Sequence, residues 1–311
     1  MNNAKPLISI GLPTYNRAAT LGRAIESALN QDYQNFELLI SDNASTDETE
    51  AICLNAAQHD NRVKYLRQQN NRGLVANFRE VLRHAGGEFF MWLSDDDWLE
   101  PGYLTRCMSV FLAEPQHSLV CGNGRYFENG TFVFDGEEFN LAQDSGVERV
   151  LSYYRTVSRN GVFFGLMRRD LISNLPFEDK LGIDWLLTAQ VVFSGKVRVL
   201  PDVHLNRSVE GASQHITSLA VNMGISGIVA RYPHLDIAAS VFKDILWKST
   251  VYRSLSALER FELAAKSSAA ICNRYCVMVW RKKLLGPSGF RATLRETLSK
   301  IRHKTIKTND S

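Results

Sequence analysis

Short apolar runs alternate with amphipathic segments along the first 120 residues of the chain. The apolar runs have the length of buried strands and lie at 7–12, 36–40, 63–66 and 88–93. The segments between them carry apolar residues at helical spacing and lie at 20–30, 45–57 and 74–85. Pro13 is expected to end the first strand, and Pro101 is expected to open a fourth helix. This alternation predicts an α/β fold with a mainly parallel, doubly wound sheet.

The pattern is more mixed from residue 118 to 215 and becomes helical beyond that stretch. Short β-like pieces lie at 118–121, 131–134, 161–167 and 196–200. Helical pieces lie at 147–156 and 185–193. From about 216 onward the chain reads as helix throughout. We therefore expect an α/β domain over residues 1–215 and a helical, basic extension over residues 216–311.

Charge is distributed unevenly along the chain. Residues 274–311 hold ten Lys/Arg against two acidic residues, so this segment is +8 and the rest of the chain is −5. Trp280 beside three basic residues at 281–283 suits an interfacial helix on an anionic membrane surface. The alternatives are a helical extension packed on the catalytic domain, or a homodimer interface. No recognisable nucleic-acid-binding motif accompanies the charge, so nucleic acid is not expected as a partner.

The location of the protein is expected to be cytoplasmic, with peripheral attachment to the inner face of the membrane as the extension suggests. The chain has no signal peptide pattern and no run of about 18 apolar residues that would predict a spanning helix. Its five cysteines are scattered and match neither a zinc site nor a disulfide framework. Free thiols in a reducing compartment are the simplest interpretation.

Polar loops follow three of the predicted strands, where ligands bind in open parallel sheets. They lie at 13–17, 41–45 and 94–97. The third contains Asp95, Asp96 and Asp97, whose mutual repulsion a divalent cation such as Mg²⁺ or Mn²⁺ would relieve. The alternative is an acidic loop that caps the helix near Pro101. The two other loops favour the metal site over this alternative, because the three loops together offer groups that suit a base, a diphosphate and a metal.

Two residues of these loops can be interpreted either as ligand-binding residues or as ordinary turn residues. Tyr15 offers a ring for stacking on a nucleobase, or it is a surface turn tyrosine. Asp42 suits hydrogen bonding to the base or ribose, or it is a turn residue near a helix. Arg17 supplies the cation for the diphosphate.

Four motifs carry a resemblance to a known family. They are PTYNR at 13–17, SDNASTD at 41–47, NRG at 71–73 and LSDDDWL at 93–99. In order and spacing they resemble the family 2 inverting glycosyltransferases, which have the GT-A fold. The match is clear over about residues 6–115 and weaker to about 215. It implies a nucleotide-diphosphate sugar as donor, and a donor site formed by Pro13, Tyr15, Arg17, Asp42, Arg72, Asp95 and Asp96.

The resemblance also implies the metal ligands and the catalytic base. Many relatives have Asp where this chain has Ser94, so either Asp96 or Asp97 is the principal metal ligand. Asp184 matches the family's base, although Ile183 stands where the family has an acidic neighbour. The base takes the proton of the acceptor hydroxyl during attack on the anomeric carbon. The alternative is that Asp184 is only an acidic residue in the first turn of a helix, where the helix dipole favours negative charge.

Further residues resemble the end of the family's catalytic domain. His204, Arg207 and His215 are implied to approach the diphosphate or the metal, with His204 as a candidate ligand. Structural histidines are the alternative.

The leading hypothesis is a metal-dependent inverting transferase whose acceptor is a glycan, lipid-linked, of a bacterial surface polysaccharide. A non-catalytic nucleotide-sugar-binding or scaffold protein is the first alternative, which Ile183 favours. A sugar nucleotidyltransferase is the second. Such enzymes usually carry a Gly-rich loop with a lysine after the first strand, where this chain has Pro-Thr-Tyr-Asn.

Overall fold

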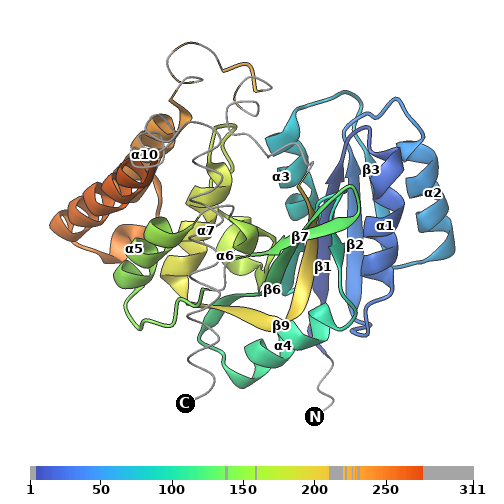
Figure 1. The fold of residues 1–311 in the computed structure, drawn as a ribbon, viewed down its shortest axis with the longest axis horizontal. Helices are drawn as coiled ribbons and strands as arrows, with labels where there is room; N and C mark the ends of the chain where they lie inside the picture. Colours follow the sequence, from blue (N-terminus) through green and yellow to red (C-terminus); the bar gives the residue numbers. More distant parts are fainter. Residues whose placement is uncertain are drawn as a thin grey trace.

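A mixed nine-stranded sheet forms the centre of the described part of the computed structural model (Figure 1). The structure describes residues 5–136, 139–157, 160–209 and 232–275, and positions 220, 223–225, 227 and 229. The strands are β1 (Ile8–Thr14), β2 (Phe36–Asp42), β3 (Val63–Arg67), β4 (Phe89–Trp92), β5 (Trp98–Leu99), β6 (His117–Glu128), β7 (Thr131–Asp135), β8 (Leu166–Arg168) and β9 (Lys196–Ser208). Their order is β3-β2-β1-β4-β8-β6-β9-β5, and β7 pairs with β6.

Helices cover both faces of this sheet. They are α1 (Ala18–Leu29), α2 (Thr49–His59), α3 (Leu74–His84), α4 (Tyr103–Ala113), α5 (Gly146–Thr156), α6 (Asp170–Ser173) and α7 (Ile183–Ser194), with a 3-10 turn, η1 (Gly161–Phe164). In Figure 1, α1 and α2 lie to the right of the sheet, and α5, α6 and α7 gather on the left.

Alternating side chains of the strands feed two separate hydrophobic cores. In β4, Phe89 and Met91 pack with α1 and α4 in one core, whereas Phe90 and Trp92 pack with α3, α5 and α7 in the other. This split follows from the two-residue period of a strand, which points successive side chains to opposite faces. Strands buried on both faces read as continuous apolar runs, and this made β1, β2 and β4 visible in the sequence.

The predicted α/β fold is confirmed. The ladders β3-β2-β1-β4 and β6-β9 are parallel, while β8, β7 and β5 pair antiparallel with their neighbours. The longest strands, β6 and β9, run beyond their predicted ends and pair along residues 117–127 and 196–208. This pairing decides where the site lies, because it carries the end of β9 to the loop that follows β4.

Three expectations about local structure are wrong. The first strand continues through Pro13 to Thr14, because β4 pairs with β1 only as far as Gly11 and needs no N–H from Pro13. Helix α4 begins at Tyr103 rather than Pro101, since Gly102 has a left-handed φ of 81°. The predicted strand at 161–167 is a 3-10 turn followed by the short β8.

The region beyond 216 is helical where it is described, although not as one regular helix. It contains α10 (Pro233–Lys243), a π turn η2 (Asp244–Lys248), a 3-10 turn η3 (Val251–Ser254) and a helix over residues 257–275. None of the described helices combines the length and apolar character needed to cross a bilayer. The predicted boundary near 215 and the basic segment from 276 lie outside the described residues.

Candidate active site

The loops that follow β1 and β2 are joined into one rim at the carboxyl ends of the strands. The Asn16 N–H donates to Ser45 Oγ at 2.9 Å, and the Thr46 N–H donates to Asn16 Oδ1 at 2.8 Å. Asn16 has a φ of 52°, a left-handed conformation that this short polar residue tolerates. The rim therefore occupies the position where open parallel sheets bind ligands.

Tyr15 and Arg17 lie on this rim. Tyr15 is 42% exposed, so its ring is open to stacking. The Arg17 N–H donates to Thr49 Oγ1 at 3.0 Å, and its Nε lies 3.5 Å from Asp95 Oδ1. Pro13 is buried inside β1. The first predicted loop is thus connected directly to the acidic run.

Asp42 is fully buried at the end of β2, and both of its carboxylate oxygens have partners. Oδ1 accepts from the Ser45 N–H at 2.8 Å, and Oδ2 accepts from Tyr65 Oη at 2.9 Å and Arg67 Nη1 at 2.8 Å. These three bonds leave about one of the four acceptor positions of the carboxylate for a nucleobase. Its base-binding role stays a prediction, and the structure adds a second role as a support of the rim.

Arg72 sits on the neighbouring loop, which Asn43 holds against the end of β2. Asn43 Oδ1 accepts from the Arg72 N–H at 2.8 Å, and Asn43 Nδ2 donates to Asn71 Oδ1 at 2.8 Å. The Arg72 side chain is half-exposed and lies 4.0 Å from Glu80. Its backbone is therefore fixed at the rim, while its guanidinium stays open to solvent and anions.

The described protein gives the first two carboxylates of the acidic run a single cationic partner. Asp95 is mostly buried, and Arg17 at 3.5 Å is its only ion-pair partner among the described residues. Burial, followed by the charge of Asp96, raises the pKa of Asp95 to about 7. The Asp96 carboxylate has no hydrogen-bond or ion-pair partner in the described part of the chain, although its backbone oxygen accepts from Arg23. This pair carries negative charge that a cation would balance.

Asp97 has a different environment from its two neighbours. It is buried, its Oδ2 accepts from Arg207 Nε at 3.1 Å, and its Oδ1 accepts from the Ser208 N–H at 3.1 Å. Burial raises the pKa of Asp97 to about 6, against the opposing charge of Arg207. Burial alone would lower the pKa of Arg207, but Asp97 holds it above its ordinary value. The pair ties the acidic run to the end of β9.

The described residues fit the predicted metal site only in part. Among the described residues, no group of three or more His, Cys, Asp or Glu side chains is arranged to hold a metal ion. Mg²⁺ sites often use only one or two protein carboxylates, with substrate phosphates and waters completing the shell. The unpartnered Asp96 beside Asp95 provides that smaller set of ligands.

Asp184 lies in the first turn of α7, after Gly182, whose φ of 72° starts the helix sharply. Its Oδ2 accepts from Asn160 Nδ2 at 2.8 Å. Burial raises the pKa of Asp184, while Asn160, the Trp185 N–H and the charge of Arg207 act in the opposite direction. Asp184 keeps partial exposure. A carboxylate with a raised pKa in a partly open position suits a general base.

Arg207 links the acidic run to Asp184. Its Nη1 lies 3.4 Å from Tyr126 Oη, and its guanidinium lies 4.5 Å from the centre of the Phe164 ring. A Cβ placed on Gly161, next to Asn160, would lie 3.6 Å from Arg207 Nη1. Arg207 therefore sits between Asp97 on one side and the turn that holds Asp184 on the other.

The remaining predicted residues have other surroundings. His204 Nδ1 lies 2.9 Å from Glu100 Oε2, and its Nε2 lies 3.1 Å from Arg125 Nη2. Its metal role stays a prediction. His215 lies outside the described residues. Asn160 was not recognised from the sequence, where the Asn160-Gly161 pair signals only a turn.

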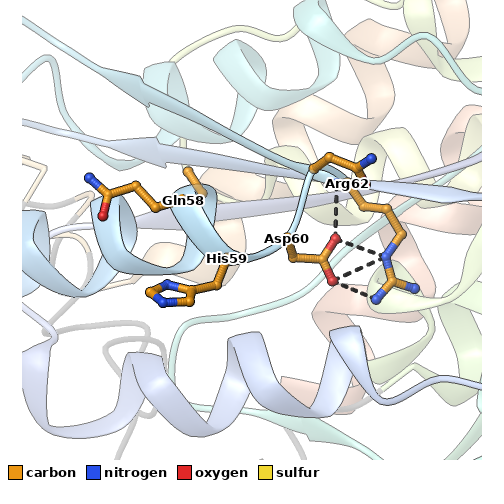
Figure 2. A pocket seen from close by; sticks show the side chains of 6 residues that line it. Gln58, His59, Asp60 and Arg62 are labelled. Atoms are coloured by element: carbon orange, nitrogen blue, oxygen red, sulfur yellow. Dashed lines mark hydrogen bonds and ion pairs between the residues drawn. The ribbon is translucent and has the colours of Figure 1, made fainter.

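A surface hollow elsewhere on the molecule is not part of this site. Residues 57–62 line it, at the end of α2 and before β3 (Figure 2). Asp60 and Arg62 form an ion pair there, with 2.6 Å between Arg62 Nη2 and Asp60 Oδ2. Because β3 begins at Val63, the hollow lies at the amino ends of the strands, opposite the rim.

Comparison with known proteins gives one family for most of the sheet. The model of "Glycosyl transferase family 2" matches residues 9–175. A Campylobacter jejuni GalNAc(5)-diNAcBac-PP-undecaprenol beta-1,3-glucosyltransferase is 31% identical over 176 residues, which are 56% of each chain. A putative colanic acid biosynthesis glycosyl transferase, WcaA of Escherichia coli, is 35% identical over 162 residues, 51% of this chain and 56% of its own. The chain thus spans about half the length of these curated relatives.

Solved structures share the fold. S. aureus TarS 1–349 superposes with a TM-score of 0.58 at 17% identity, covering 84% of this chain and 70% of its own. The mannosyltransferase PcManGT from Pyrobaculum calidifontis, in complex with GDP-Man and Mn²⁺, gives 0.55 at 16% identity, covering 93% and 83%. These likenesses confirm the GT-A type of architecture.

Proposed function

Since the chain belongs to glycosyl transferase family 2, we propose that it is an inverting transferase that moves a sugar from a nucleotide diphosphate to an acceptor hydroxyl. The observation that carries the proposal is the position of Arg207, which pairs with Asp97 and lies beside the turn that holds Asp184. One buried guanidinium thus lies between the acidic run and the turn that holds the predicted base. A scaffold protein has no need of this arrangement.

The reaction follows from the chemistry of these groups. The Asp184 carboxylate takes the proton from the acceptor hydroxyl. The hydroxyl oxygen then forms a bond to the anomeric carbon while the bond from that carbon to the diphosphate oxygen breaks on the opposite face. Tyr15 stacks on the base, and Arg17 and Arg72 pair with the anionic donor. Arg207 lies too deep for bulk solvent and offers fixed positive charge near the leaving group.

A divalent cation, Mn²⁺ or Mg²⁺, would be held by Asp96 with support from Asp95. When bound, it would neutralise charge on the leaving diphosphate. We choose Asp96 over Asp97 because both oxygens of Asp97 are already engaged. The PcManGT complex contains Mn²⁺, which supports a metal in this fold.

The acceptor is a glycan on a lipid carrier, in the synthesis of a bacterial surface polysaccharide. The names of two relatives, a PP-undecaprenol glucosyltransferase and a colanic acid transferase, support this class. We infer that transfer to such an acceptor takes place at the membrane surface on the cytoplasmic side, where the +8 segment at 274–311 would meet anionic lipid.

The test begins with a thermal-shift screen of UDP-, GDP-, dTDP- and CDP-sugars, with and without Mn²⁺. A donor that binds the native state should raise Tm by mass action. The donor found is then used in transfer assays with wild type and Asp184→Asn. The variant should bind the donor but not transfer, and unchanged turnover would remove Asp184 from its role. A protein that binds none of these donors contradicts the proposed function.

A further inference from the structure

Asn160 is buried at the centre of a small polar network around Asp184. Its Nδ2 donates to Asp184 Oδ2 at 2.8 Å and to Thr188 Oγ1 at 3.4 Å. Its Oδ1 accepts from Tyr153 Oη at 2.8 Å. Because Tyr153 donates to the oxygen side of the amide, the NH₂ side is directed at Asp184.

The backbone around Asn160 is fixed as well. Asn160 has φ 47° and ψ 40°, a left-handed conformation that asparagine adopts more readily than most residues. The turn that follows it, η1, places Phe163 on Trp92, with ring centroids 4.5 Å apart and planes within 10°. Trp92 is fully buried, and its Nε1 donates to the Phe78 carbonyl at 3.1 Å. The amide of Asn160 is therefore held from both its backbone and its side chain.

We propose that Asn160 is the positioning residue for the base Asp184, and that Tyr153 fixes the orientation of its amide. The inference rests on the proposed function. The hydrogen bond from Asn160 occupies Oδ2 and selects one rotamer of the carboxylate. The acceptor proton is then received by a lone pair of the carboxylate that Asn160 does not use. The same bond favours the charged form of Asp184, which is the form that accepts a proton.

The groups around Asp184 determine how strongly the hydrogen bond from Asn160 affects its pKa. Among the described residues, Arg207 is the charged group that acts on Asp184, and its positive charge also favours the carboxylate. The titratable groups are Tyr153, Tyr154 and Tyr275, and burial raises the pKa of each phenol, so all three stay neutral. Burial raises the pKa of Asp184, and Asn160 is one of the groups that lower it. Without Asn160 the pKa is therefore higher, and the carboxyl keeps its proton to higher pH.

The experiment compares Asn160→Gly with Asn129→Gly in the full chain. Asn129 is a matched control, because it also has a left-handed φ, of 49°, and also precedes a glycine, in the β6–β7 turn. Glycine keeps both backbones relaxed. We expect N160G to lose about tenfold to a hundredfold in kcat, the scale of a hydrogen bond to a charged group. Donor KM should change less than about twofold, and the acidic limb of the pH profile should move to higher pH.

Tyr153→Phe provides a second measurement that does not depend on how well N160G folds. Loss of its hydroxyl frees the amide, so the same shift of the acidic limb is expected with a smaller loss in kcat. If wild type transfers and both variants keep the kcat and pH profile of N129G, the inference is overturned and the proposed function stands. If wild type itself transfers no sugar from any donor, the proposed function fails.

Discussion

Replacing Arg207 by methionine should destabilise the fold by about 3–5 kcal/mol at pH 8, the cost of leaving one partner of a buried ion pair alone. The side chains of Arg207 and Asp97 are 10% and 3% exposed, so solvent cannot take over the lost interaction. Methionine keeps much of the apolar volume of arginine beside Phe164, which isolates the loss of charge. The free energy is measured by urea denaturation followed by tryptophan fluorescence.

The loss should depend on pH in a defined direction. The pKa of Asp97 is already raised to about 6 with Arg207 in place, and it rises further without it. Asp97 of the variant therefore takes its proton at a higher pH than Asp97 of the wild type, and the destabilisation should be smaller at pH 5.5 than at pH 8. The double variant R207M/D97N has neither charge and should be more stable than R207M.

Lys266→Ala is the matched control for an exposed ion pair. Lys266 Nζ and Glu262 Oε2 lie 2.8 Å apart, and the two side chains are 57% and 53% exposed. Loss of this ion pair should lower the free energy of unfolding by about 0.5 kcal/mol or less. A loss below about 1 kcal/mol in R207M at pH 8 would refute the reasoning, because the Asp97–Arg207 pair would then behave like this surface pair.

Three further outcomes are expected. Asp96→Asn should weaken donor binding in Mn²⁺ by about tenfold or more and leave binding in EDTA unchanged; equal calorimetric affinities in Mn²⁺ would contradict its role as a ligand. The acidic limb of the wild-type pH profile should lie above the ordinary aspartate range, because burial raises the pKa of Asp184 and transfer needs its carboxylate; a limb within the ordinary range would count against it. Asp244→Asn should stabilise the fold by about 3 kcal/mol at pH 8, since burial raises the pKa of Asp244 to about 6 and each unit is worth about 1.4 kcal/mol. Asp244 of the wild type binds its proton more tightly when folded, so the gain should disappear below about pH 4 in urea denaturation, and Asn can still accept from Gln190 Nε2.

Local pattern was enough to predict the first half of the sheet. The apolar runs that became β1, β2, β3 and β4 were placed within about two residues. For β1, β2 and β4 the reason is that strands buried on both faces are continuous in the sequence. The ends of β6 and β9 were missed, because Asn123, Arg125 and Arg207 interrupt their apolar pattern. Arg125 and Arg207 are tolerated there because Glu100 and Asp97, far away in the sequence, pair with them.

The same limit applies to the site. The motifs predicted which loops meet, and the rim of Asn16, Ser45 and Asp95 follows from parallel strands ending at one edge. The environments of the three aspartates did not follow, since the partner of Asp97 lies 110 residues away. Asn160 was missed because its role depends on a turn whose position is set by the stack of Phe163 on Trp92.

The bond between Asp97 and Arg207 also constrains how such chains can exchange parts during evolution. The family match ends at residue 175, before β9 supplies Arg207. A recombinant that joins the first 175 residues of this chain to the end of a relative keeps a buried Asp97 but inherits whatever residue that relative has at position 207. We expect the two positions to covary, so that viable exchanges are confined to relatives that share the pair.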